Sequence, residues 1–171
     1  MNDWLRDQEY TLPASAWFIG LTLFCALALS WLPWSGGLLV LRPDFTALML
    51  LYWCTHRPNQ VGLGVSWLVG ILADVADASM FGQHALAYTV LAFGGILMHR
   101  RIQLFDLRQQ ILQAFPLLLL SYLIYAGVHW QVRGYVAWSY FIGSATTAAL
   151  WIPLALLLQA VRQHRASDDE L

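Results

Sequence analysis

The stretch RPDFTALMLLYWCTHRPNQVGLGVSWLVGILADVADASMFGQH, residues 42–84, sets polar residues at helical spacing inside an otherwise apolar chain. Its charged members are Arg42, Asp44, Arg57, Asp74 and Asp77. A charged side chain at the centre of a membrane costs about 2.5–3.5 kcal/mol on insertion scales, so it usually has a partner or a function. Either the fold supplies partners for these charges, or the charges mark a functional site.

The composition of the whole chain is that of an integral membrane protein. Hydrophobic residues make up 59% of its 171 residues, charged residues only 11%, and the mean hydropathy is +0.57. Soluble domains carry about 25% charged residues. The basic residues are nine arginines without a basic block. Nucleic acid is therefore excluded as a partner, because it is bound through clustered positive charge.

Stretches without Asp, Glu, Lys or Arg define the expected membrane spans. They cover residues 10–41, 45–56, 58–73, 78–99, 109–132 and 134–161. Four of these reach the length of about 20 residues that a spanning helix needs, and the two short ones fit helices with charged ends. We therefore predict an all-α integral membrane protein with six transmembrane helices in a single polytopic domain, residues 1–171.

The arginines predict the orientation of these helices. With both ends of the chain in the cytoplasm, seven arginines lie inside and only Arg42 and Arg133 outside, as the positive-inside rule requires. Residues 1–12 then form a cytoplasmic N-terminal segment and residues 162–171 a polar, mobile cytoplasmic tail. We also expect residues 99–110 to form a short amphipathic link at the inner leaflet, and Pro153 to kink the last span.

Small residues follow one face of the expected third helix. Gly62, Ser66 and Gly70 are spaced four apart, and Asp74 continues the same face. Small residues at this spacing let another helix backbone approach closely. The neighbouring helix could belong to this chain or to a partner, and both alternatives remain open from the spacing.

Two polar groups flank this face. Asp74 and Asp77 are three residues apart, so on a continued helix they share one side. They could meet a partner's arginine, bind a cation, act as acid and base, or simply cap a helix in a hydrated loop. Arg42-Pro43-Asp44 suits a helix start, because proline fits the first turn and a carboxylate favours the positive end of the helix dipole. It could instead form a polar corner that faces a partner or pocket.

Known catalytic arrangements do not fit these residues. Two catalytic carboxylates of a peptidase must be brought together with different protonation states, whereas Asp74 and Asp77 come from one segment. The Asn- and Asp-Arg-containing signatures of lipoprotein signal peptidase are not found. Neither Ser66 nor Ser144 belongs to a motif that supplies a general base. The histidines, none of them paired four apart as on a zinc helix, are His56, His84, His99, His129 and His164. We expect no enzyme, no cofactor and no metal site.

A family resemblance emerges from the order of motifs in residues 42–91. The matching residues are Arg42-Pro43-Asp44-Phe45, residues 48–53, Pro58, Gly62, Gly64, Gly70, Asp74, Gly82-Gln83-His84 and Leu86. Together with the length and the six expected spans, they resemble the proteobacterial rod shape-determining family MreD. Some relatives carry Asn where this chain has Asp44, so the resemblance does not require a charge at that position.

The resemblance implies a non-catalytic inner-membrane subunit of the cell-elongation complex, which helps to position or regulate peptidoglycan synthesis. The implied partner is MreC, which has one membrane span. The same complex would contain RodA, a class B penicillin-binding transpeptidase, RodZ and MreB. The family fold is similar to the S-components of energy-coupling-factor transporters.

The residues and the resemblance together predict two sites. The face formed by Gly62, Ser66, Gly70 and Asp74 is the expected contact for MreC, because a single-span partner needs a face of small residues. The polar corner or pocket is expected at Arg42, Pro43, Asp44, Asp77 and His84. An alternative function follows from the fold analogy: a small-molecule or lipid-binding transport subunit whose pocket is lined by Arg42, Asp44, Asp74 and His84. A shared fold does not by itself transfer that function.

Overall fold

The computed structural model describes residues 15–32, 41–77, 80–134 and 139–168, and these residues contain helices and no strand. The helices are α2 (Ala16–Ser30), α3 (Phe45–His56), α4 (Leu63–Ala76), α5 (Gln83–Leu104), α6 (Leu107–Arg133), α7 (Ser139–Ala149) and α8 (Trp151–Asp168). The expected N-terminal segment, residues 1–12, lies outside the described residues.

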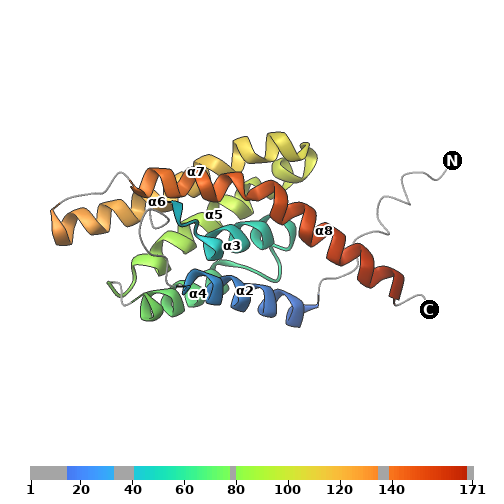
Figure 1. The fold of residues 1–171 in the computed structure, drawn as a ribbon, viewed down its shortest axis with the longest axis horizontal. Helices are drawn as coiled ribbons and strands as arrows, with labels where there is room; N and C mark the ends of the chain where they lie inside the picture. Colours follow the sequence, from blue (N-terminus) through green and yellow to red (C-terminus); the bar gives the residue numbers. More distant parts are fainter. Residues whose placement is uncertain (1–14, 33–40, 78–79, 135–138, 169–171) are drawn as a thin grey trace.

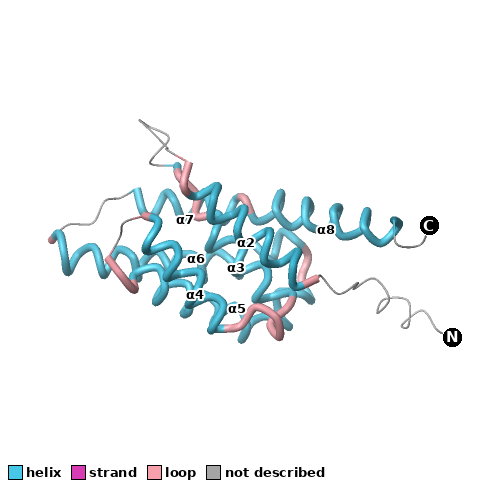
Figure 2. Tube along the Cα trace, turned by 90° about the horizontal axis from the view of Figure 1, so that it is seen from below, coloured by secondary structure: helices cyan, strands magenta, loops and turns pink. Residues whose placement is uncertain are grey.

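Helix α3 forms the centre of the bundle. It packs against α2, α5, α6 and α7, and the ribbon and tube views both place it among these helices (Figures 1 and 2). Ten of its twelve residues are buried. Trp53 is fully buried and donates its indole N–H to the Thr22 hydroxyl of α2 at 3.0 Å. A helix that is hydrophobic all round belongs in the interior, which explains why the shortest charge-free stretch becomes the core helix.

The predicted link at residues 99–110 is wrong. Helix α5 continues to Leu104 and α6 begins at Leu107, so only Phe105 and Asp106 connect them. The turn is closed because the side chain of Gln110 donates to the Phe105 carbonyl at 3.0 Å. The apolar residues of this stretch are the ends of two long helices. Helix α8 likewise extends to Asp168, through most of the segment expected to be a mobile tail.

The last span bends where proline chemistry requires it. Helices α7 and α8 are separated only at Leu150, three residues before Pro153. A proline inside a helix lacks an N–H and its ring clashes with the carbonyl four residues earlier, which here is that of Ala149. The amide of Leu154 still bonds to the Leu150 carbonyl at 3.1 Å, so the two pieces remain one bent helical unit.

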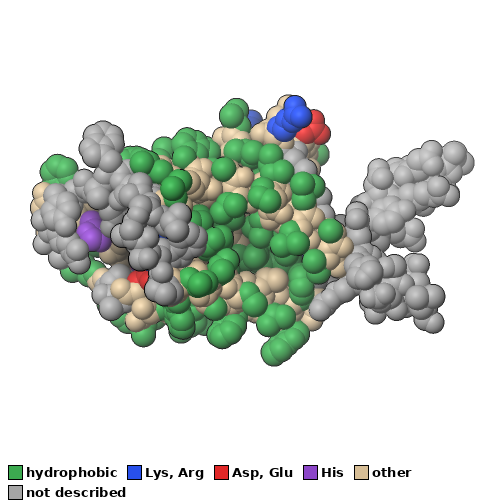
Figure 3. Space-filling view, viewed as in Figure 1, with side chains coloured by type: hydrophobic (Ala, Val, Ile, Leu, Met, Phe, Trp, Pro, Cys, Tyr) green, Lys and Arg blue, Asp and Glu red, His purple; other side chains and the backbone are tan. Residues whose placement is uncertain are grey.

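The outer surface of the bundle is apolar. Large side chains such as Trp17, Phe24 and Leu112 are 78%, 66% and 81% exposed, and hydrophobic side chains cover most of the described face in Figure 3. Exposed apolar area on this scale marks a membrane or protein contact. Two segments, Arg108–Gln131 and Phe141–Leu158, are long and apolar enough to cross a membrane, and α2 and α4 are shorter apolar helices.

The described charges divide between the two ends of the bundle. Arg57, Arg100, Arg101 and Arg108 lie where α3 and α5 end and α6 begins, which we call the arginine end. Arg42 and Asp44 precede α3, and Asp74 and Asp77 lie at the end of α4; we call this opposite end of the bundle the polar end. The first turn of α2 and the last turn of α8 both lie toward the arginine end (Figure 1). This separation of charge agrees with the arginine bias read from the sequence.

We expect Trp53→Ala to lower the free energy of unfolding by about 3–5 kcal/mol, because it empties a fully buried indole site in α3. Thermal and denaturant unfolding of the detergent-solubilised protein measures this loss. Trp67→Ala is the matched control, because Trp67 of α4 is 52% exposed on the outer surface. Equal losses in the two variants would contradict the central position of α3.

Candidate functional site

Polar side chains from five parts of the chain meet inside the polar end of the bundle. They come from the segment before α3, from α4, α5, α6 and α7. We call this set the polar centre; its members are Arg42, Asp44, Asp74, Asp77, His84, Tyr88, Tyr122, Tyr125 and Thr147. The residues expected at a polar corner are therefore brought together, with Pro43 buried beside them at the start of α3.

The carboxylate of Asp74 caps the N-terminus of α5. Its oxygens accept hydrogen bonds from the backbone N–H groups of Gly82 at 2.8 Å, His84 at 2.8 Å and Ala85 at 3.4 Å. The ring Nδ1 of His84 lies 2.9 Å from the same carboxylate. The first N–H groups of a helix have no partner within the helix and carry the positive end of its dipole. These donors offset the cost of a carboxylate whose side chain is 0% exposed.

The carboxylate of Asp44 joins three helices. Its Oδ1 accepts the backbone N–H of Ala47 at 2.8 Å, which caps α3 as the sequence predicts. The hydroxyl of Tyr88 on α5 donates to its two oxygens at 3.0 and 3.1 Å, and that of Tyr125 on α6 donates at 3.0 Å. A buried tyrosine hydroxyl needs a hydrogen-bond partner, and Asp44 provides one acceptor for both.

A second polar chain connects Asp44 to α7. The backbone N–H of Asp44 donates to the Thr147 hydroxyl at 2.9 Å, and that hydroxyl lies 3.1 Å from the Tyr122 hydroxyl. Thr147 is fully buried and also bonds to the Gly143 carbonyl of its own helix. One short segment before α3 therefore fixes the relative positions of α5, α6 and α7.

Arg42 links the ends of α2 and α4. Its guanidinium forms an ion pair with Asp77, the C-cap residue of α4, at 3.2 Å. It also donates to the carbonyl of Ser30, the last residue of α2. A cation is favoured at a helix C-terminus, because the free carbonyls there carry the negative end of the dipole. Both side chains of the ion pair are 32% exposed, so solvent screens the pair and it contributes little energy by itself.

His84 connects the carboxylates of Asp74 and Asp77 to the tyrosines that bind Asp44. Besides its contact with Asp74, its Nε2 is 3.8 Å from Asp77. Its ring packs against the rings of Tyr125 at 4.9 Å and Tyr88 at 5.7 Å between centroids. The polar centre is thus continuous, from the Arg42 ion pair through His84 to the tyrosines around Asp44.

The face of small residues on α4 is covered by the same chain. A Cβ on Gly70 would lie 2.4 Å from the Cα of Ala85, so the backbones of α4 and α5 touch there. Ser66 is fully buried, and its hydroxyl lies 3.7 Å from the sulfur of Cys54 on α3. Gly62 is partly exposed at the start of α4. Of the two alternatives left by the spacing, the structure shows packing within the chain.

This packing bears directly on the expected MreC contact at Gly62, Ser66, Gly70 and Asp74. A partner helix could reach Gly70 or Asp74 only by displacing α5, because α5 already occupies that side of α4. The contact with MreC itself remains a prediction. We do not assign it to this face.

Sequence reasoning missed four members of the polar centre, the three tyrosines and Thr147. A signal was present, since Tyr122 and Tyr125 are three residues apart and therefore share a helix face. Within the described residues, no group of three or more His, Cys, Asp and Glu side chains is arranged to hold a metal ion. The carboxylates of Asp44 and Asp74 are instead engaged by O–H and N–H donors.

The helices have apolar outer faces, the described charges lie mainly at the two ends, and the buried carboxylates are paired within the bundle. These features define a helical integral membrane protein. A family model described as rod shape-determining protein MreD matches residues 14–161. The rod shape-determining protein MreD of Haemophilus influenzae is 29% identical over 152 residues, which cover 86% of this chain and 92% of that relative. The chain belongs to the MreD family, which has a role in determining rod shape. No solved structure matches it, so the likeness to transporter S-components stays a prediction.

We expect Asp74→Ala to destabilise the protein strongly, because it leaves the backbone N–H groups of Gly82 and His84 without their acceptor. Each unsatisfied buried group costs about 1–3 kcal/mol. The loss is measured as a lower midpoint of denaturant unfolding. Asp77→Ala, which removes a part-exposed ion pair, should change the free energy of unfolding by only about 1 kcal/mol or less. A small effect of Asp74→Ala would argue against the cap.

Substitution of Gly70 tests the contact between α4 and α5. Gly70→Ala should reduce the yield of monodisperse protein in size-exclusion chromatography, because the new Cβ would overlap the backbone of Ala85. Gly64→Ala is the matched control on the same helix, since a Cβ there meets no atom within 4 Å. If both variants behave like the original protein, the backbones do not touch at Gly70.

Proposed function

We propose that the protein is a non-catalytic inner-membrane subunit of the cell-elongation complex. In this role it binds MreC and helps to position or regulate peptidoglycan synthesis, in one assembly with RodA, a class B penicillin-binding transpeptidase, RodZ and MreB. It crosses the membrane several times and keeps both ends of the chain in the cytoplasm. Membership of a rod shape-determining family supports this role.

The observation that carries the proposal is how the buried charges are used. Asp74 caps α5, and Arg42 joins the ends of α2 and α4. Asp44 caps α3 and accepts hydrogen bonds from two tyrosine hydroxyls. A catalytic acid needs a partner of different protonation state and a place for substrate beside it. Apart from the local cap at Ala47, the donors around each buried carboxylate come from other helices of the bundle or from their N-cap residues. Such an arrangement supports a scaffold better than a reaction centre.

A partner with one membrane span would have to meet an outward face of the bundle, and the outward face of α4 is our candidate. Helix α4 packs mainly against α5, so its other side points away from the core. That side presents Leu63, Trp67, Leu68, Leu72 and Val75, each more than one-third exposed. Tryptophan is enriched among the residues that contribute most of the binding energy at protein interfaces.

Affinity capture of the tagged protein in mild detergent tests the proposal. Co-expressed MreC should be recovered with the original protein. Trp67→Ala combined with Leu68→Ala should reduce recovery by about tenfold, as expected when about 1.4 kcal/mol of binding free energy is lost. Phe24→Ala, on the exposed face of α2, is the control and should leave recovery unchanged. No recovery of MreC with the original protein would contradict the proposed role. An equal loss of MreC recovery in both variants would indicate that the contact is not specific to α4.

The alternative, a transport subunit with a pocket at Arg42, Asp44, Asp74 and His84, gains no support from the geometry. These side chains do lie close together, but their hydrogen bonds are made with groups of the bundle's own helices. Recovery of an ATP-binding cassette module in the same capture experiment would favour this alternative instead.

A further inference from the structure

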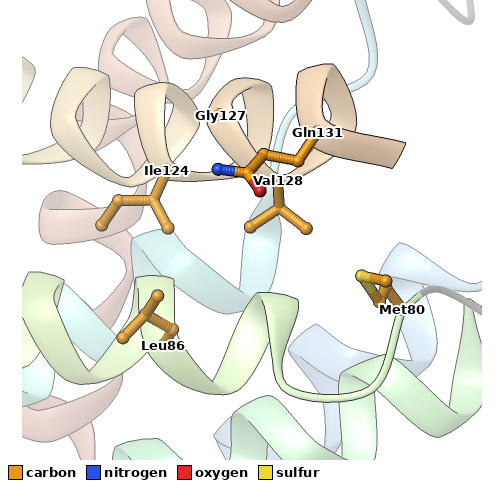
Figure 4. Close-up of a pocket in the computed structure, with 6 residues that line it drawn as sticks. All are labelled: Met80, Leu86, Ile124, Gly127, Val128 and Gln131. Atoms are coloured by element: carbon orange, nitrogen blue, oxygen red, sulfur yellow. The ribbon is translucent and has the colours of Figure 1, made fainter. Parts of the chain in front are cut away.

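An apolar groove lies between α5 and α6 toward the polar end of the bundle. It has a volume of about 530 Å³, and its lining residues are Met80, Leu86, Ile124, Gly127, Val128 and Gln131. Figure 4 shows the α6 side chains facing Leu86 of α5 and Met80 across the open space. We propose that this groove binds one acyl chain of a phospholipid.

The groove is formed by the outward faces of two helices whose inward faces build the polar centre. On α6, Ile124, Gly127, Val128 and Gln131 follow the spacing of a single helix face. On α5, Leu86 lies between His84 and Tyr88, which point into the polar centre. The ring centroids of His84 and Tyr125 are 4.9 Å apart, and these rings fill the space between α5 and α6 on the core side of the groove. The groove therefore opens sideways, away from the core.

The position along α6 places this opening in hydrocarbon. Its lining from Ile124 to Gln131 belongs to the apolar segment Arg108–Gln131, which is long enough to span a membrane. Gln131 is the last residue of that segment, next to Trp130, which is 65% exposed. Tryptophan concentrates at the level of lipid headgroups, so the amide of Gln131 lies where it can donate a hydrogen bond to an ester carbonyl.

The size of the groove favours a lipid chain over a protein helix. A helix is about 10–12 Å wide and rises about 5.4 Å per turn, so the groove holds roughly one turn of it. A stable protein interface uses about 20–30 residues a side, against six residues that line this groove in the described part of the chain. An acyl chain is narrow and flexible enough to follow the space, and Gly127 leaves room for it, because a Cβ there would meet no atom within 4 Å.

Photo-crosslinking in lipid nanodiscs tests the site. The probe is a phosphatidylglycerol with a diazirine in one acyl chain, and adducts are mapped by mass spectrometry on the full-length protein. Adducts should concentrate on peptides that contain Leu86 and residues 124–131 rather than on the exposed apolar face of α2 around Phe24. Adducts spread evenly over both faces would overturn the proposal, and this comparison needs no substitution.

A pair of glycine variants makes the test specific to the groove. Gly127→Phe should lower adducts at Leu86 about fourfold or more, which corresponds to the displacement of one methylene group. Gly20→Phe is the control, because Gly20 on α2 has the same open surroundings. Unchanged adducts at Leu86 in Gly127→Phe would contradict the site. Loss of these adducts from the original protein when MreC is co-reconstituted would assign the groove to a protein partner and overturn the lipid proposal.

Discussion

The contact between the Asp74 carboxylate and the first turn of α5 is the constraint on which the polar end depends. It holds the last turn of α4 against the backbone of α5, where Gly70 permits direct contact with Ala85. The same contact fixes His84, which in turn packs against Tyr88 and Tyr125. A carboxylate in an apolar bundle is stable here because helix N–H groups, which would otherwise lack partners, surround it.

The arrangement explains how a chain with so few charged residues can hold buried acids inside an apolar bundle. Asp44 and Asp74 each satisfy a helix N-terminus, and Arg42 satisfies the C-terminal carbonyl of α2. Helix ends are the places where backbone groups lack partners, and water cannot supply them inside a membrane. Polar side chains at the end of the bundle thus hold its helices in register, while the outer surface remains apolar.

Several sequence predictions depended on local rules and were confirmed. Asp44 caps α3, and the last helix is interrupted at Leu150 shortly before Pro153, because both effects act within about one turn of the backbone. Pro43 lies one position before the cap and not in the first turn, where the sequence placed it. The prediction for residues 99–110 failed, since the apolar and charged pattern of two helix ends resembles that of one amphipathic link. The spacing of Gly62, Ser66 and Gly70 correctly indicated a close helix contact, but spacing alone does not identify the neighbouring helix.

The sequence by itself determined that this is a helical membrane protein, because composition and the spacing of charges reflect the cost of burying polar groups in hydrocarbon. It also determined the cap of α3 at Asp44 and the family. Only the tertiary structure decided the partners of Asp44 and Asp74, because their donors lie between eight and 81 residues away along the chain, apart from the local cap at Ala47. Hydrogen bonds between helices follow from how the helices pack, and that packing is a property of the whole bundle.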